Sequence, residues 1–196
     1  MSEQRVNRIL VAAYGCFASH GFRKTTMDDI ATAAGMSRPA IYQYVRNKQD
    51  AFRRLATTIL DEATRDAGEA AAAGGTLTQR LDRVLAVKLT TTARLLRDGP
   101  HTIDLIRANA DLERAFTTAL VDLLTATIMT AATDADLRLG DGNAREVAEL
   151  ALALTRGLEA DLPLSGDPPE KPFERLRNGV ALLVAGLAAA TNPVRG

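Results

Sequence analysis

Hydrophobic residues recur at intervals of three and four along almost the whole chain, which is the spacing of one face of an α-helix. In residues 5–20, Val6, Ile9, Ala13 and Phe17 follow this spacing, and Gly21 is the expected stop. No run alternates between polar and apolar residues for long enough to indicate a strand. The pattern therefore predicts an all-α protein.

Glycine and proline divide this pattern into about nine helices. We expect them near residues 5–20, 27–34, 38–44, 48–73, 76–97, 102–109, 112–132, 143–162 and 172–191. Thr76 with Gln79 resembles a capping box, and Asn143 is expected to cap the eighth helix after an acidic loop at 134–142. Pro172 suits the first turn of the last helix.

Charge divides the chain although the total is zero. Residues 1–55 carry nine Lys or Arg and four Asp or Glu, a net of +5, and the remainder is acidic by the same amount. A basic segment favours a polyanionic partner. We expect a basic head at residues 1–50 that binds a polyanion and a larger helical body at residues 51–196.

Few residues favour catalysis, a membrane or a metal. The lone cysteine, Cys16, excludes an internal disulfide and fits a reducing cytoplasm. The later apolar run at 180–190 falls short of the ~20 residues that span a bilayer. His20 and His101 lack a partner at metal-ligand spacing. We therefore expect no enzyme activity, no cofactor, no metal and no membrane association.

Residues 25–45 are typical of a helix-turn-helix, in which two short helices meet at a sharp turn containing Gly35. The apolar positions that should face inward are Met27, Ile30, Ala31, Ala34, Ile41 and Val45. This leaves Arg38, Pro39, Tyr42 and Gln43 pointing mostly away from the core. Arginine, glutamine and tyrosine on an exposed helix suit the base edges and phosphates of a major groove.

Three further residues suit phosphate binding at helix starts. Thr26 and Ser37 are expected N-caps, and a helix N-terminus offers free N–H groups to an anion. Lys48 lies in the first turn of a long helix, where a cation opposes the helix dipole. A bound phosphate would offset this unfavourable interaction.

The same segment closely resembles the tetracycline-repressor (TetR) family over about residues 5–55. The matching residues are Phe17-Ala18-x-x-Gly21-Phe22, Thr25-Thr26-x-x-Asp29-Ile30-Ala31-x-x-Ala34-Gly35-Met36-Ser37 and Ile41-Tyr42-x-Tyr44-Val45-x-Asn47-Lys48. Val45 departs from the family's usual phenylalanine, and Pro39 stands where small residues are common. Beyond residue 55 the resemblance rests on helix number and length alone.

The resemblance implies a three-helix DNA-binding head and a homodimer formed through the last two helices. It implies that Thr26, Ser37, Tyr42 and Lys48 hold phosphates, while Arg38, Pro39 and Gln43 face the bases. Tyr44, in the same motif, completes the DNA-binding set. The implied function is a cytoplasmic repressor, released from a pseudo-palindromic operator by a small-molecule effector, although the sequence does not separate repression from activation.

Apolar stripes mark the last two expected helices. They consist of Val147, Leu150, Ala151, Leu154 and Leu158, then Leu176, Val180, Leu183, Val184 and Leu187, with Ala148, Ala181 and Ala185 available for close packing. By themselves these stripes fit an intramolecular core. The family resemblance instead favours a dimer face.

Effector-binding residues are expected on the helices between. The candidates are Thr90, Thr91, His101, Asn109, Phe116, Thr125 and Met129, a mostly apolar set with a few polar groups. The threonines could equally bond to their own helix carbonyls, and His101 could be a surface residue. The alternative function is a small-molecule carrier or helical enzyme whose head is purely structural, and it predicts no affinity for duplex DNA.

Overall fold

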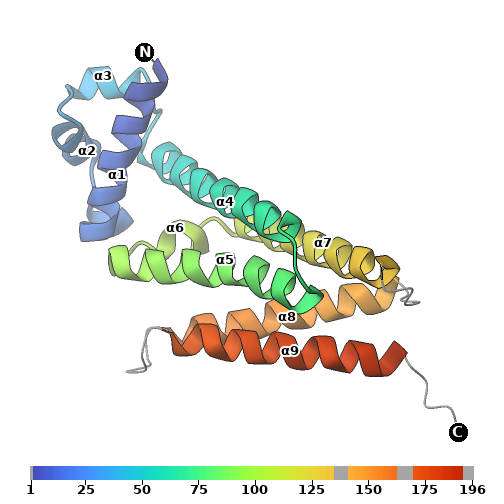
Figure 1. The fold of residues 1–196 in the computed structure, drawn as a ribbon. Coiled ribbons are helices and arrows are strands. Elements are labelled where there is room, and N and C mark those ends of the chain that lie inside the picture. The colour runs from blue at the N-terminus through green and yellow to red at the C-terminus, as the bar shows by residue number, and fades with distance from the viewer. Residues whose placement is uncertain (1, 135–140, 163–169, 192–196) are drawn as a thin grey trace, which may run out of the picture. The chain divides into compact units, whose positions relative to one another are not determined.

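The computed structural model describes residues 2–134, 141–162 and 170–191. Within these ranges the chain forms nine helices and no strand, which confirms the all-α prediction (Figure 1). The helices are α1 (Ser2–Lys24), α2 (Met27–Ala34), α3 (Arg38–Tyr42), α4 (Lys48–Ala72), α5 (Leu77–Asp98), α6 (Asp104–Arg107), α7 (Ala110–Asp134), α8 (Asp141–Asp161) and α9 (Lys171–Thr191).

Most helix ends follow the local signals in the sequence. Gly21 interrupts α1 with a φ of 74° and a ψ of 163°, so the predicted break is present although a last short turn follows it. The Thr76–Gln79 capping box is confirmed, because each residue's backbone N–H donates to the other's side chain, at 3.0 and 3.3 Å. The predicted cap at Asn143 is wrong, since α8 begins two residues earlier at Asp141. Most of the expected acidic loop, residues 135–140, lies outside the described residues.

The chain divides into two compact units. The first unit is Met1–Glu62 with Arg94–Arg114, and the second unit is Ala63–Ala93 with Ala115–Gly196. Residues 94–114 therefore pack with the N-terminal helices rather than with the rest of the expected body. The functional division at residue 50 stays a prediction.

The core of the first unit explains why residues 94–114 belong to it. Phe17, on α1, contacts the Phe22 and Phe52 rings with centroids 5.7 and 5.2 Å away. Leu95 and Leu105, at most 1% exposed, join the same buried cluster. Burying a side chain of that size contributes about 1.5–3 kcal/mol. The short α2 and α3 thus depend on a core to which α5 and α6 contribute.

The connection between α5 and α6 lies closely against one face of α1. The Tyr14 hydroxyl donates a 2.6 Å hydrogen bond to Asp98. A Cβ added at Gly99 would lie only 2.8 Å from the Ala18 carbonyl oxygen, so no larger residue fits there without movement. Residues 14 and 18 are one helical turn apart and share a face. These two contacts fix the end of α5 on the N-terminal helix.

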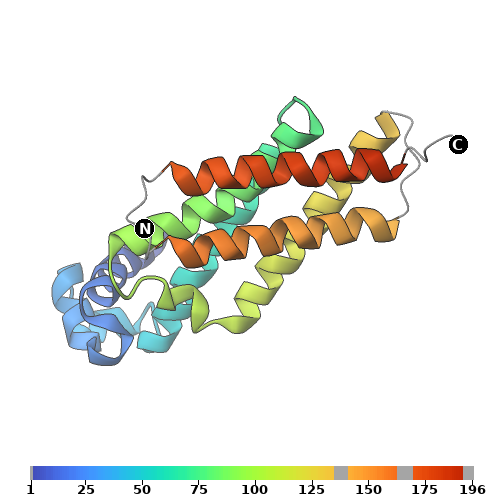
Figure 2. The ribbon, with the colours of Figure 1, turned by 90° about the horizontal axis from the view of Figure 1, so that it is seen from below.

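In the second unit, α8 and α9 run antiparallel and side by side (Figures 1 and 2). Both helices bury small and apolar residues, among them Ala144, Ala148, Ala151, Leu176 and Val180, all at most 1% exposed. Gly179 lies at this contact, and a Cβ added there would clash with the Leu154 side chain unless that side chain moved. Part of the predicted apolar stripe is therefore intramolecular core.

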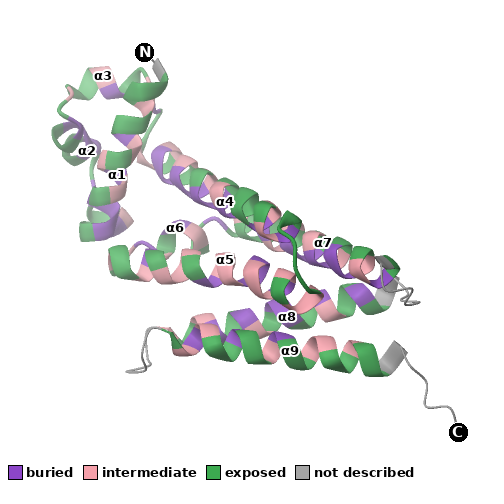
Figure 3. Cartoon of the chain, in the orientation of Figure 1, coloured by how far each residue is buried: buried purple, intermediate pink, exposed green. Residues whose placement is uncertain are grey.

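The remaining apolar surface of α9 is open in the single chain (Figure 3). From Ala181 to Ala189 the helix carries only alanine, leucine, valine and glycine, and none of these residues is buried. Leu182 is 75% exposed, and Leu150 of α8 is 51% exposed. Such a continuous apolar strip is unusual on the surface of a monomer.

A charged pair joins α5 to α8 inside the second unit. Lys88 Nζ lies 2.7 and 2.6 Å from the two carboxylate oxygens of Glu159, and Thr92 donates to the same carboxylate at 2.5 Å. The two charged side chains are only 12% and 14% exposed. The pair was not among the expected features, although a lysine inside Val84-Leu85-Ala86-Val87-Lys88-Leu89 is a signal for it.

One described helix is long and apolar enough to cross a membrane. It lies between Ala110 and Thr133, with a mean hydropathy of 1.5 over its most apolar window, of which 39% is buried. Polar residues interrupt the apolar sequence of α7, so it contains no long unbroken apolar run. Core helices of water-soluble proteins pass the same test, so one such helix is weak evidence for a membrane span.

Candidate nucleic-acid interface

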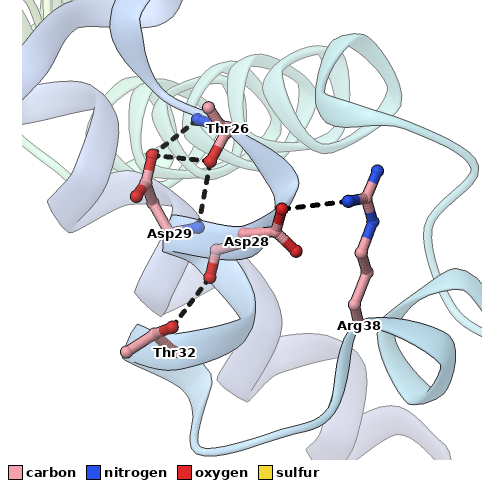
Figure 4. Close-up of polar contacts among 5 residues, drawn as sticks. All are labelled: Thr26, Asp28, Asp29, Thr32 and Arg38. Atoms are coloured by element: carbon pink, nitrogen blue, oxygen red, sulfur yellow. Dashed lines mark hydrogen bonds and ion pairs between the residues drawn. The ribbon is translucent and has the colours of Figure 1, made fainter.

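Helix α2 begins with a reciprocal capping box (Figure 4). The Asp29 backbone N–H donates to Thr26 Oγ1 at 3.2 Å, and the Thr26 backbone N–H donates to the Asp29 carboxylate at 2.8 Å. The Thr26 hydroxyl also donates to this carboxylate, at 2.8 Å, and these bonds lower the pKa of Asp29. The Thr26 cap is confirmed. Its phosphate contact stays a prediction, and the hydroxyl proton already has an acceptor.

The turn between α2 and α3 depends on Gly35. This residue adopts a left-handed conformation, with φ 62° and ψ 38°, that glycine adopts at little cost. Its N–H and that of Met36 donate back to the last turn of α2, Met36 to the Ala31 carbonyl at 3.0 Å. The turn thus ends α2 and sets the direction of α3, as the predicted helix-turn-helix requires.

Helix α3 presents the expected side chains to solvent. Ile41 and Val45 are at most 1% exposed and anchor the helix, whereas Arg38, Pro39, Tyr42 and Gln43 are exposed. Ser37 occupies the N-cap position, but its side chain makes no capping hydrogen bond. The predicted division between an inward and an outward face is therefore confirmed, and the outward roles stay predictions.

Arg38 is held by two neighbours in the absence of a partner. Its guanidinium lies 2.9 Å from the Asp28 carboxylate of α2 (Figure 4). It also lies 5.8 Å from the centre of the Tyr42 ring. The Tyr42 hydroxyl and then Asp28 raise the pKa of Arg38. Both charged side chains are more than half exposed, so the ion pair is weak and a phosphate or base can replace it.

Tyr44 and Lys48 have structural partners that the sequence did not suggest. The half-buried Tyr44 accepts a 2.9 Å hydrogen bond from Arg5 on α1. Lys48 Nζ donates to the backbone carbonyls of Phe22, Arg23 and Thr25, at 2.8, 3.2 and 2.9 Å. An ammonium group has three protons, so all three are used. Lys48 therefore offsets the negative end of α1, and its phosphate role stays a prediction.

The seven effector candidates fall in both units rather than around one described cavity. In the second unit, Thr91 and Thr125 donate to the Val87 and Val121 carbonyls of their own helices, at 2.9 and 2.7 Å, as the alternative interpretation proposed. Thr90 is exposed, Phe116 is buried and Met129 is half-buried. In the first unit, the buried Asn109 donates to the Leu105 carbonyl at 2.7 Å, and His101 lines a cavity.

Known proteins match this chain most specifically over the helix-turn-helix. Residues 9–55 match the model of the bacterial regulatory proteins of the tetR family. The chain is 39% identical over 70 residues to the HTH-type transcriptional regulator YhgD of Bacillus subtilis, which covers 36% of this chain and 37% of that protein. It is 43% identical over 47 residues to an acrEF/envCD operon repressor of Escherichia coli K12, 24% of this chain and 21% of that one.

Residues 9–55 are those of a tetR-family regulatory protein. Solved structures share the fold of the whole chain: a transcriptional regulator from Pseudomonas aeruginosa PAO1 aligns with a TM-score of 0.76 over 98% of this chain and 96% of its own, at 18% identity. A TetR-family regulator from Rhodococcus aligns with a TM-score of 0.70 over 92% and 98%, at 20% identity. The predicted family resemblance is confirmed.

The match to the tetR-family model ends at residue 55, within α4. The chain spans about a third or less of the curated relatives that it matches. The solved structures are only about 20% identical to this chain, so for the remaining helices they establish the fold and nothing more. The family model that matches residues 9–55 is one of bacterial regulatory proteins.

Proposed function

We propose that this chain is a DNA-binding transcription regulator of the tetR family that reads an operator with α3. The observation that carries the proposal is the exposed outer face of α3, formed by Arg38, Pro39, Tyr42 and Gln43, on a helix anchored by Ile41. The fitting partner is the major groove of duplex DNA, because arginine and glutamine match base edges there. The net charge of +5 on residues 1–55 supports the approach to DNA.

The contacts in the free protein divide the eight predicted DNA-binding residues. Arg38, Pro39 and Gln43 are assigned to bases, with Ser37 and Tyr42 on phosphates. Thr26 contacts phosphate only if its hydroxyl leaves Asp29. Tyr44 and Lys48 act mainly by holding α1 against the following segments. In this proposal, the last two support the interface without taking part in base recognition.

The proposal includes a homodimer formed through α8 and α9. The occupant of the exposed apolar strip on α9 is a second copy of this chain, because a symmetric pair buries the same surface twice. Leu182 and Leu150 would lie in that contact. A symmetric pair presents two copies of α3, which fits half-sites about 34–36 Å apart.

The effector and the direction of regulation also belong to the proposal. A small molecule bound in the second unit would release the DNA by favouring a dimer with the wrong half-site spacing. Repression is proposed from the operon repressor of Escherichia coli, to which the head is similar. A cytoplasmic location is consistent with the buried free thiol of Cys16.

The test is selection of duplexes bound by the full chain from random DNA. A pseudo-palindromic sequence should be enriched, and its affinity should fall steeply with salt. Arg65→Ala is the control variant for the loss of one positive charge outside the proposed interface, because Arg65 is an exposed arginine of the second unit that pairs with Asp66. Failure to enrich any sequence, together with no salt-dependent affinity for duplex DNA, would overturn the proposal and favour a small-molecule carrier.

A further inference from the structure

The first unit contains a cavity of about 550 Å³ between the end of α1, the start of α4 and α6. Its volume lies within the range of about 300–1,000 Å³ that is usual for sites of small organic ligands. Every residue that lines it belongs to the first unit. It is therefore separate from the effector site proposed for the second unit, and nothing in the DNA-binding proposal uses it.

The cavity has an aromatic wall. Phe22 and Phe52 both line it, and their ring centroids are 4.7 Å apart. Phe52 is buried at 2% exposure, whereas Phe22 is half-buried and keeps part of its surface open. Aromatic rings pack favourably against these surfaces in offset or edge-to-face arrangements. The wall suits a flat apolar group.

The rest of the lining is predominantly cationic. Arg23, Lys24 and Arg107 contribute three permanent positive charges, against the single carboxylate of Asp104. None of these three cations forms an ion pair with another residue that the structure describes. An anion entering the cavity would therefore find donors that have not already been neutralised.

Both histidines of the chain also line this cavity. His101 lies close to the backbone of α1, since a Cβ added at Gly21 would be 3.2 Å from His101 Cγ. Gly21 has a φ of +74°, which other residues rarely adopt, so glycine is needed there for two reasons. The same glycine thus breaks α1 and leaves room for the His101 ring beside it.

We propose that this cavity binds a small organic anion with a flat apolar body. The carboxylate of the ligand lies among Arg23, Lys24 and Arg107, and its ring lies against Phe22 and Phe52. The two histidines border the bound molecule. This site goes beyond the proposed regulation of transcription, because neither its lining nor its shape depends on DNA or on an effector in the second unit.

The test uses 2-naphthoate as the probe and the two histidines as reporters. In the full chain with labelled imidazole carbons, the histidine region contains only the signals of His20 and His101, and His20→Gln assigns them. Both signals should shift and saturate as 2-naphthoate is added. The affinity for the uncharged 2-naphthamide should be lower by at least about tenfold, because the amide loses the charge-assisted hydrogen bonds.

Two variants and one control locate the site. Arg107→Gln should weaken 2-naphthoate by about tenfold. Ala108→Leu, at an exposed lining residue, should block it by filling the cavity while the chain stays folded. Arg114→Gln removes an exposed arginine of the same unit that does not line the cavity, and should leave the affinity unchanged.

Four results would overturn the proposal. They are the absence of any shift in both histidine signals, equal affinity for the amide, unchanged affinity in the folded Ala108→Leu variant, and equal affinity for inorganic phosphate. The last result would show that the cations serve a bare phosphate, such as that of a nucleic-acid backbone. Loss of duplex binding in the full chain would leave the expected naphthoate result unchanged, so the two proposals fail separately.

Discussion

The Tyr14 hydroxyl donates a 2.6 Å hydrogen bond to the Asp98 carboxylate and so ties the first helix to the end of the fifth. Tyr14 is half-buried, and burial, followed by the bond to Asp98, raises its pKa. Tyr14→Phe removes the hydroxyl while keeping the ring. We expect it to lower the free energy of unfolding by about 1 kcal/mol at neutral pH, measured by urea denaturation.

The same bond predicts a pH dependence at high pH. A phenol with a raised pKa in the folded state keeps its proton there, while the unfolded chain loses it above about pH 10. The contribution is therefore present below pH 10 and is lost as the pH rises toward the folded pKa of Tyr14. The wild type should lose its advantage over Tyr14→Phe above pH 10. An unchanged difference between the two proteins from pH 8 to 11 would contradict this account.

Lys48 allows a test between a structural and a DNA-contacting role. Lys48→Met keeps the aliphatic stem but leaves the Phe22, Arg23 and Thr25 carbonyls without their donor. We expect a loss of about 2 kcal/mol in the free energy of unfolding. Lys24→Met, at an exposed lysine of the same unit, should cost far less. Operator affinity measured against salt on folded protein then decides the role: an unchanged slope supports structure alone, and a slope lower by about one indicates a lost phosphate contact.

Some of this site could be predicted from sequence because its signals are local. Thr26 directly precedes α2 and Gly35 directly follows it, so the bounds of that helix follow from its caps. The exposed face of α3 follows from the spacing of Ile41 and Val45. In each case the decisive partner lies within a few residues along the chain.

Other features depended on partners far away in sequence and could not be predicted. The acceptors of Lys48 lie 23 to 26 residues before it, so its position at a helix start looked unfavourable and suggested a phosphate. Leu105 packs in the core of the first unit with residues that lie far before it in the sequence. The predicted division at residue 50 placed it in the other part of the chain. Of the predicted effector-binding residues, Thr91, Asn109 and Thr125 instead donate to carbonyls four residues before them.

Arg38 should determine sequence preference rather than general affinity. Arg38→Ala removes a base-reading group, so affinity for the selected operator should fall roughly tenfold while affinity for random duplex changes little. Asp28→Asn provides the matched test, because it removes the carboxylate charge that pairs with the Arg38 guanidinium at 2.9 Å. That variant should bind the operator at least as tightly as the wild type. Equal losses on operator and random duplex for Arg38→Ala would exclude base recognition by this residue.

Leu182 tests the proposed dimer. Leu182→Glu places a charge at the most exposed large apolar position of the described chain. A symmetric contact would have to bury this charge close to the same charge of the second copy. Sedimentation should show a shift from dimer to monomer. Val11→Glu is the control, since Val11 is also exposed, at 64%, but lies on α1. A dimer that persists unchanged in Leu182→Glu would show that the apolar strip on α9 is not the contact.

The pair of Lys88 and Glu159 provides a test of the core of the second unit. Removing one partner leaves the other charge in surroundings where it is only 12–14% exposed. Lys88→Met should therefore lower the free energy of unfolding by about 3 kcal/mol. The double variant Lys88→Met with Glu159→Leu should recover most of this loss, because two apolar residues of similar volume replace a costly charged pair. Urea denaturation of the four proteins in this cycle measures the coupling. If the double variant is no more stable than Lys88→Met, the cost comes from lost packing around α5 rather than from an unpaired carboxylate.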